Sequence, residues 1–569
     1  MTTIGSVPLE EFSYGMDLCG ADPASLNDAL REVTAEVMSD PLRVGTLMST
    51  FMLAEQTVAM NAMRRMQGDN PPPVAAANGD KRFSDPAWTS NPFLMSMVEE
   101  YLVRRQYALQ IVEQSRAPEA TKRKARFAMT MMMDSLAPSN LPWLNPMVVK
   151  EAVDTGGASL VKGMQEFLDD VQHNGGYPKQ VDTSTFTLGE NMAATKGEVV
   201  FRNELIELIA YYPQTEKVYE RPLLMSPPWI NKYYIMDLAP GRSFVEWAVK
   251  HGHQTFMISY RNPDESMRDY TMDTYLEKGP LAALDAVQRL TGAPSVNVAA
   301  LCLGGTMAVL MLAYLAAKGE ADRVNSLTIT NTIVDFTEPG DLGVFTDEAS
   351  IAKLEKKMNE RGFLESSEMA GTFNWMRAND LIWSYVVSNW YMGKKPPAFD
   401  ILAWNGDSTR MPAAMHSQYL RSCYLHNLLV VPNAFVLGGV PIDLGKIHTP
   451  MYVLGAEADH IAPWRTTYMT SQYVSGPVKY TRTNSGHVAG ICNPPGNKKA
   501  CYWTADAAET GESPDAWLER STKHQGSWWE DWATWIDAHG GAKRDPYPLP
   551  EGGEPAPGRY VRNESAVEA

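Results

Sequence analysis

Cysteine is scarce in this sequence of 569 residues, and its few copies are not arranged in pairs. The five cysteines are Cys19, Cys302, Cys423, Cys492 and Cys501, and no two of them form a CxxC motif. This spacing argues against a disulfide framework and against a zinc site, because both use cysteines at regular paired spacings. We therefore expect no bound metal and a chain that stays in a reducing compartment.

The sequence also has little positive charge and lacks a secretory leader pattern. Its 50 Lys and Arg residues are outnumbered by 67 Asp and Glu, which gives a formal net charge of −17. Proteins that bind a nucleic-acid backbone need a basic face, so we exclude nucleic acid as the main partner. The first 20 residues contain no basic stretch followed by an apolar one, so we expect no signal peptide.

No apolar run is both long and uninterrupted enough to predict a membrane span. Residues 296–319, VNVAALCLGGTMAVLMLAYLAAKG, come nearest, but Asn297 and the Gly304-Gly305 pair interrupt them. The first part is typical of a buried β-strand and the second part is typical of a helix. We predict a core strand-turn-helix unit here.

Strand signals are nearly absent before about residue 195, where apolar residues recur at helical spacing. From Gly197 to Phe336, short β-branched or apolar runs alternate with helical segments, which predicts a parallel α/β sheet. In the N-terminal part we predict helices over residues 40–68, 91–115, 119–136 and 145–175.

The strand-helix alternation stops after Phe336 and resumes with TPMYVLGAEAD and PVKYTRTNSGH. We interpret the residues between as an insertion that caps the active-site edge of the sheet. The Pro- and Gly-rich tail from Ala542 is expected to be loosely ordered. The predicted organisation is a mainly helical N-terminal domain (1–190), the first part of a catalytic domain (191–336), a cap (337–446) and the second part of the catalytic domain (447–569).

The turn of the strand-turn-helix unit contains Cys302, within Ala300-Leu301-Cys302-Leu303-Gly304-Gly305. A nucleophile at a sharp strand-to-helix turn needs small neighbours, and the following helix N-terminus stabilises a thiolate and an oxyanion. A lone cysteine among apolar residues is more often an inert core residue. The sharp turn is what favours the nucleophile.

Two further residues follow later strands in the order that a catalytic triad of this fold requires. Asp459 follows MYVLG, where a carboxylate can orient an imidazole, and His487 lies in the Gly-flanked loop NSGHVAG. The chain order Cys302, Asp459, His487 predicts an α/β-hydrolase fold with an N-terminal helical domain and an inserted cap. Each residue alone is a weak signal, since strand ends often carry turn residues. His460 competes as the base, but its neighbour Asp459 points in a divergent direction, so we expect His460 to be structural.

An oxyanion hole in this fold takes one N–H from the residue after the nucleophile and another from the loop after an earlier strand. Leu303 would supply the first. The loop SPPWINKYY would supply the second, with Ile230 or Trp229 as the candidate. A rigid Pro-Pro turn is the simpler interpretation of this loop, and the two interpretations are compatible.

These residues lie within a longer resemblance to the polyhydroxyalkanoate synthases, the family that polymerises (R)-3-hydroxyacyl-CoA into polyester. The similar stretches cover most of the chain from about residue 135 onward. They include ENMAATKGEVVFRNELIELIAYYP, PLLMSPPWINKYYIMDLAPGRSFVEW, ISYRNPD, the CLGGT turn, LAWNGDSTRMP, GAEADHIAPW, NSGHVAGICNPP and GSWWEDWATWI. Such a set is far more specific than the turn alone.

The resemblance implies roles for the three residues: Cys302 carries the acyl group, His487 activates it as the base, and Asp459 assists the incoming hydroxyl. It implies no cofactor beyond the coenzyme A thioester that serves as substrate. It further implies a homodimer that works without a second type of subunit, in the cytoplasm and on polymer granules.

Some site residues are named with less support. Trp229, Tyr260 and Trp404 are candidates for substrate binding, with Trp404 also a candidate for a cap or dimer contact and core packing as its simpler role. A basic mouth for the anionic coenzyme A is expected, and Lys232, Arg261 and Arg465 are its candidates. The family's turn usually begins with Gly, whereas this chain has Ala300, which puts rate or substrate preference in question.

Two other functions remain open from the residues themselves. A cysteine-dependent thioesterase or polyester depolymerase of the same fold would use water in place of the hydroxyl, although a hydrolase more often carries Ser at the turn. A catalytically silent granule-coat protein would lose at least one of Cys302, Asp459 and His487, and all three are present.

Overall fold

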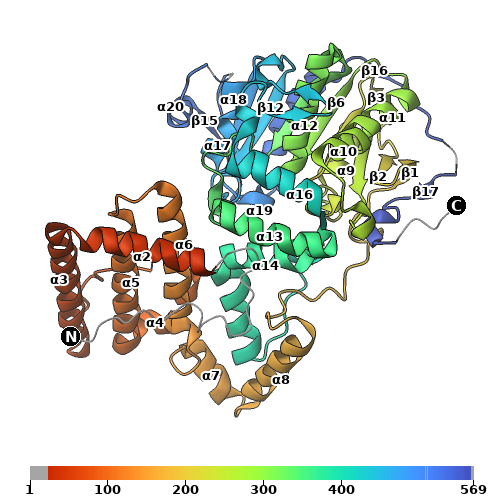
Figure 1. Ribbon diagram of the computed structural model, residues 1–569. Helices are drawn as coiled ribbons and strands as arrows, with labels where there is room; N and C mark the ends of the chain where they lie inside the picture. Colours follow the sequence, from red (N-terminus) through yellow and green to blue (C-terminus); the bar gives the residue numbers. More distant parts are fainter. Residues whose placement is uncertain (1–22, 78, 507, 509, 551, 565–569) are drawn as a thin grey trace. The chain divides into compact units, whose positions relative to one another are not determined.

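The structure is a computed structural model that describes residues 23–77, 79–506, 508, 510–550 and 552–564 (Figure 1). The chain divides into two compact units, Met1–Asp182 with Glu368–Ala398, and Thr183–Ser367 with Phe399–Ala569. Cys19 and the segment examined for a signal peptide lie outside the described residues. In the part of the chain that is described, no helix has the length and apolar character needed to cross a bilayer.

The first unit is helical, as the sequence predicts. Asp40, Asn91 and Asn145 each precede a helix and accept a hydrogen bond from a backbone N–H of its first turn, which fixes where these helices begin. The main helices are α2 (Pro23–Met38), α3 (Pro41–Met66), α5 (Pro92–Glu113), α6 (Glu119–Ser135), α7 (Pro146–Asp154) and α8 (Ala158–His173).

The predictions for α3, α5 and α6 agree with the structure within two residues. The prediction of one helix over residues 145–175 is wrong, because α7 and α8 are separate. Gly156 and Gly157 lie between them with φ of 58° and 86°, in the left-handed region that a continuous helix does not use.

Glu368–Ala398 groups with the first unit, although the sequence analysis placed these residues in the cap. The π-helical segment η9 (Val386–Tyr391) packs on α8, where the indole N–H of Trp390 donates to Asp170 at 2.8 Å. Gly163 permits this close approach, since a Cβ there would stand 2.0 Å from the Trp390 carbonyl oxygen. The aromatic side chains of the segment therefore find their partners on the N-terminal helices.

Within the described residues of the second unit, eleven strands form one sheet. Strands β5, β4, β6, β7, β12 and β13 run parallel in that spatial order, and antiparallel strands extend both edges. The strands are β1 (Gly197–Arg202), β2 (Ile206–Tyr211), β4 (Leu223–Ser226), β5 (Thr255–Tyr260), β6 (Val296–Leu301), β7 (Val324–Thr330), β12 (Met451–Ala456), β13 (Val478–Thr483), β14 (Cys501–Thr504), β15 (Thr522–Gln525) and β17 (Glu554–Pro555).

Helices α9 (Phe244–Lys250), α11 (Ala282–Thr291), α12 (Leu303–Lys318) and α21 (Trp528–Ala538) accompany this sheet (Figure 1). Three tryptophans of α21 pack inward. Trp528, Trp529 and Trp532 are buried around Phe244, and the Trp532 indole donates to Thr328 of β7 at 2.9 Å. This cluster secures α21 to the sheet.

The expectation of a loosely ordered tail is wrong for the described residues after Ala542. Strand β17 pairs with β1, which adds the tail to the edge of the sheet. The carboxylate of Glu207, buried in β2, accepts hydrogen bonds from the backbone N–H groups of Arg559 and Tyr560. These bonds order a segment whose Pro and Gly content alone predicts flexibility.

Candidate active site

Cys302 lies between β6 and α12 with φ 51° and ψ −122°, a conformation that non-glycine residues rarely adopt. Its N–H donates to the Thr330 carbonyl at 2.9 Å. Its own carbonyl accepts from the N–H of Gly305 at 2.9 Å and from the Thr332 hydroxyl at 3.1 Å. The surrounding bonds therefore hold a strained turn, as expected for a presented nucleophile.

The Gly304-Gly305 pair is required by close approaches on both sides of the turn. A Cβ on Gly304 would stand 2.4 Å from the carbonyl oxygens of Ser226 and Pro227. A Cβ on Gly305 would stand 2.0 Å from the Thr332 hydroxyl. The start of α12 thus packs directly against the end of β4, where the predicted oxyanion loop begins.

His487 and Asp459 meet at the carboxyl ends of neighbouring parallel strands. His487 begins α19 (His487–Ile491) just after β13, and Asp459 follows β12. The Nδ1 of His487 lies 2.6 Å from Oδ2 of Asp459, whose side chain is fully buried. The other oxygen of Asp459 accepts the N–H groups of Ile461 at 2.9 Å and Ala462 at 2.8 Å. The carboxylate is therefore fixed and aimed at the imidazole.

The charges around His487 favour its protonated form. Burial by itself lowers the pKa of an imidazole, but here the negative charges of Asp459 and of the Cys302 thiolate, and hydrogen bonds to both side chains, raise the pKa of His487 well above its usual value. Since Nδ1 faces Asp459, Nε2 is the nitrogen left for Cys302. The structure thus brings together the three residues that the sequence nominated, with the imidazole of His487 between Asp459 and Cys302.

Asn331 is a further residue of this site that the sequence analysis missed. It follows β7, and its side-chain amide donates to the His487 carbonyl at 2.5 Å. Its backbone N–H donates to Leu454 of β12 at 2.8 Å. Its position just after a strand could have nominated it from the sequence, as the position of Asp459 did.

The predicted oxyanion donors lie at the same sheet edge. Leu303 is the first residue of α12, so its N–H has no acceptor within the helix. Ser226 of β4 pairs with Ala300 of β6, so the loop after β4 starts beside the turn. Ile230 is buried within that loop. The roles of these two N–H groups as oxyanion donors remain predictions, and the positions of Leu303 and Ile230 are consistent with them.

Aromatic side chains from the insertion lie near the nucleophile within the second unit. Tyr419 packs edge-on against Trp229, with ring centroids 5.7 Å apart, and against Tyr424 at 5.5 Å. Burial raises the pKa of both tyrosines, with a smaller contribution from the negative charge of Cys302, which places them near the thiol. Neither tyrosine was nominated from the sequence, because no local pattern reports a contact with such a distant turn.

The candidate substrate residues differ in their surroundings. Trp229 is buried between Tyr419 and Tyr275, and Tyr260 stacks on Tyr275 at 5.7 Å. Trp404 is buried, and its indole N–H donates to the Lys232 carbonyl at 2.8 Å. Trp229 therefore belongs to the aromatic wall around the site, whereas Trp404 supports the loop that contains Lys232.

Comparison with known proteins identifies the family. The profile described as "Poly-beta-hydroxybutyrate polymerase (PhaC) N-terminus" matches residues 79–248, and that described as "alpha/beta hydrolase fold" matches residues 232–494. The poly(3-hydroxyalkanoate) polymerase of Methylorubrum extorquens is 41% identical over 572 residues, covering 98% of this chain and 94% of its own. The chain belongs to the poly(3-hydroxyalkanoate) polymerase family. This finding confirms the resemblance seen in the sequence and, with the sheet order, the α/β-hydrolase fold.

Other family members are similar over comparable lengths. The polymerase subunit of Rhizobium meliloti (strain 1021) is 39% identical and covers 95% of this chain and 89% of its own. That of Cupriavidus necator is 37% identical and covers 93% and 90%. A solved hydrolase from Pseudomonas aeruginosa PA01 aligns with 52% of this chain and 94% of its own, at 14% identity and a TM-score of 0.30. A TM-score this low does not support a fold assignment. The α/β-hydrolase fold is assigned from the family profile and the sheet topology.

Ala300, where the polymerase family usually has Gly, lies in regular β6. It pairs with Ser226 of β4 and Ile329 of β7 and precedes the strained residue by two positions. Its added methyl group occupies ordinary strand geometry, so it leaves the turn at Cys302 intact.

The candidate basic residues are each paired with a carboxylate. Lys232 is buried and contacts Asp407 at 2.7 Å, Arg261 pairs with Asp264, and Arg465 pairs with Asp515 at 2.6 Å. Arg465 is the most exposed of the three, with 57% of its side chain accessible. The basic mouth for coenzyme A therefore remains a prediction. A residue of such a mouth must be exposed, whereas Lys232 is buried.

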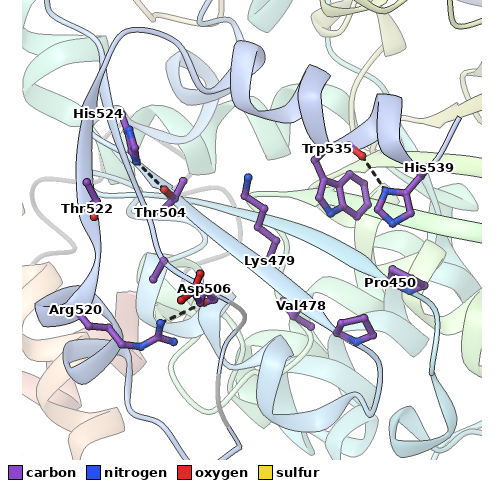
Figure 2. A pocket seen from close by; sticks show the side chains of 12 residues that line it. Pro450, Val478, Lys479, Thr504, Asp506, Arg520, Thr522, His524, Trp535 and His539 are labelled. Carbon is purple, nitrogen blue, oxygen red and sulfur yellow. Dashed lines mark hydrogen bonds between the residues drawn. The ribbon is translucent and has the colours of Figure 1, made fainter.

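A hollow of about 870 Å3 is lined by residues at the amino ends of β12 and β13 (Figure 2). Its lining includes Pro450, just before β12, and Val478, the first residue of β13. These are the amino ends of strands whose carboxyl ends precede Asp459 and His487. Its lysine, Lys479, is already paired with Asp531 at 2.7 Å. The hollow is therefore separate from the acyl-transfer site.

Proposed function

We propose that this polymerase uses Cys302 as the residue that carries the growing acyl chain, with (R)-3-hydroxyacyl-CoA as substrate. The observation that carries the proposal is the position of His487, bonded to Asp459 on one side and to Cys302 on the other. A thiolate accepts an acyl group from a thioester at little cost in free energy, which suits coenzyme A substrates.

In the first step, the Cys302 sulfur attacks the substrate's thioester carbonyl and the carbon–sulfur bond to coenzyme A breaks. The imidazolium of His487 gives its proton to the departing thiolate, so free coenzyme A leaves. The N–H groups of Leu303 and Ile230 would stabilise the intermediate's oxyanion. The products are an acyl-Cys302 and a neutral imidazole.

In the second step, His487 takes the proton from the 3-hydroxyl of the next substrate, and the oxygen attacks the acyl-Cys302 carbonyl. An ester bond forms, the Cys302 thiolate leaves, and the thiolate-imidazolium pair is restored. The lengthened chain now ends in a coenzyme A thioester, which acylates Cys302 again. Asp459 acts through His487, because its buried carboxylate contacts the imidazole and two backbone N–H groups.

A substrate without the hydroxyl tests the covalent step. With butyryl-CoA, we expect one coenzyme A released per chain and a protein mass raised by one butyryl group on Cys302. Cys302→Ala should show neither change, with unchanged circular dichroism because little volume is lost. Cys423→Ala is the matched control, since Cys423 is a buried cysteine of the insertion. Butyryl transfer that persists in Cys302→Ala would overturn the proposal.

We also propose that the enzyme works in the cytoplasm as a homodimer at the surface of polymer granules. Support comes from α8, where Leu160, Val161, Met164, Leu168 and Val171 are exposed and offer an apolar surface. Replacing Val161, Met164 and Leu168 with Ser should leave the protein in the supernatant when granules are sedimented. Triple replacement of the exposed polar residues Lys162, Gln165 and Asp169 with Ser on the same helix is the control. Equal sedimentation of both variants would contradict this role, and ultracentrifugation of the polymer-free protein tests the dimer.

A further inference from the structure

Lys232 has a buried ammonium group in the loop that follows β4. Its side chain is only 4% exposed, and it lies two residues after Ile230, the candidate oxyanion donor. The Nζ contacts Oδ1 of Asp407 at 2.7 Å and donates to the Val561 carbonyl at 2.6 Å. A buried charge is costly unless it is paired and hydrogen-bonded, so these partners define one geometry for the loop.

Asp407 belongs to the insertion, and the segment around it holds the loop at several points. Its Oδ2 accepts the hydroxyl of Tyr234 at 2.8 Å, while the Trp404 indole donates to the Lys232 carbonyl at 2.8 Å. Asn231 forms an antiparallel bridge with Ser408. The residues on both sides of Lys232 are thus tied to the same short stretch of the insertion.

The second partner of Lys232, Val561, lies in the C-terminal segment. That segment is anchored to β2 and its turn, because Glu207 accepts the N–H of Tyr560 at 3.0 Å and the Tyr560 hydroxyl donates to the Asn203 carbonyl at 2.7 Å. Lys232 therefore joins the loop to two parts of the chain that are distant in sequence and separately anchored.

We propose that Lys232 is a positioning residue for the oxyanion hole, holding the loop so that the N–H of Ile230 faces the acyl carbonyl at Cys302. This inference rests on the proposed function, in which that N–H stabilises the oxyanion. An oxyanion donor works only within a few tenths of an ångström of its place. The Lys232-Asp407 pair makes the hole depend on the insertion being seated on the loop. Lys232 acts through the loop and not by contact with coenzyme A.

Two reactions at Cys302 separate this role from a general structural one. Acylation by (R)-3-hydroxybutyryl-CoA forms an oxyanion, whereas alkylation by iodoacetamide is a displacement that forms none. In Lys232→Met we expect kcat for coenzyme A release to fall at least about tenfold, with KM and the rate of Cys302 alkylation each within about twofold of the parent. Lys250→Met is the control, because Lys250 is an exposed lysine that pairs with Glu246 in the same unit.

Two further variants keep the test readable if Lys232→Met does not fold. Asp407→Asn keeps an acceptor for Tyr234 and should lower kcat by a smaller factor than Lys232→Met. The double variant Lys232→Met/Asp407→Leu leaves no unpaired charge and should still show the loss of kcat. A folded single or double variant with parental kcat, or one whose alkylation falls as much as its kcat, would overturn the inference. Failure of the proposed function itself would differ, because Cys302→Ala would then still release coenzyme A.

Discussion

The imidazole of His487 has a carboxylate behind it, with Nδ1 2.6 Å from Oδ2 of Asp459. Two backbone N–H groups hold the other oxygen of that carboxylate, so neither ring nor carboxylate needs to reorganise during acyl transfer. The pair is oriented before substrate binds, and its consequences can be measured at Cys302.

Replacing His487 by Gln should slow labelling of Cys302 by iodoacetamide at pH 7, because the imidazolium that stabilises the thiolate is lost. We expect coenzyme A release to fall by at least about 100-fold, the usual scale for loss of a general base. Labelling is followed by the mass of the Cys302 peptide. His460→Gln is the control, and a larger loss there than in His487→Gln would make His460 the base.

Asp459→Asn should lose activity at a lower pH than the parent on the alkaline side of the pH profile. Asp459 raises the pKa of His487, so its loss lowers that pKa. Acylation needs protonated His487 to release coenzyme A, and that form would disappear at a lower pH than in the parent. The alkaline limb of the second-order rate constant for acylation of Cys302 by butyryl-CoA should therefore move to lower pH. If the alkaline limb does not move in Asp459→Asn, Asp459 instead serves the incoming hydroxyl. In that case the substitution should slow elongation alone.

The close packing of the turn on β4 predicts a strong contrast between two small substitutions. Gly304→Ala forces a methyl group against two backbone carbonyl oxygens, which cannot rotate away. We expect it to lower the free energy of unfolding by about 2–3 kcal/mol and to impair acylation. Ala300→Gly, in regular β6, should change stability by about 1 kcal/mol at most and keep activity. Chemical denaturation measures both, and equal effects would refute the packing argument.

Asp237 gives a prediction for stability. Burial raises the pKa of this carboxyl to about 6, against the opposing effect of hydrogen bonds from Ser243 and Thr195. The folded state therefore keeps this proton up to about pH 6, whereas the unfolded state loses it near pH 4. The stability that the proton contributes is lost as the pH rises through 6. Asp237→Asn can still accept both hydrogen bonds through its oxygen. Its unfolding free energy relative to the parent should rise between pH 5 and pH 7.5, by about 1.4 kcal/mol. A difference independent of pH would mean that folding leaves the pKa of Asp237 near its usual value.

The parts of this fold that local pattern determines were predictable from the sequence. Strand β6 is a mainly apolar run, interrupted at Asn297, before a glycine pair, and it occurs where the pattern places it. Strand β2 was not predicted, because Glu207 interrupts its apolar face. That carboxylate is compensated by Arg202 and by the tail, neither of which a local pattern can report.

The candidate site divides in the same way. The triad was nominated because each member follows a strand, and parallel strands bring their carboxyl ends to one edge. Tyr419 and the Lys232-Asp407 pair are contacts between segments far apart in the chain. Their residue types carry no sign of that proximity, so only the folded structure identifies them.

The fate of the acyl group tests the central claim most directly. The parent protein and Cys302→Ala are incubated with (R)-3-hydroxybutyryl-CoA, and coenzyme A, free 3-hydroxy acid and high-mass ester are all quantified. The account predicts one coenzyme A per monomer and nearly all acyl groups in high-mass ester, because the largely apolar site disfavours attack by water on the Cys302 thioester while the next hydroxyl is held close. It predicts none of these products with Cys302→Ala. Coenzyme A released together with mostly free acid from a folded parent protein would contradict it, and would make the chain a thioesterase whose insertion admits water.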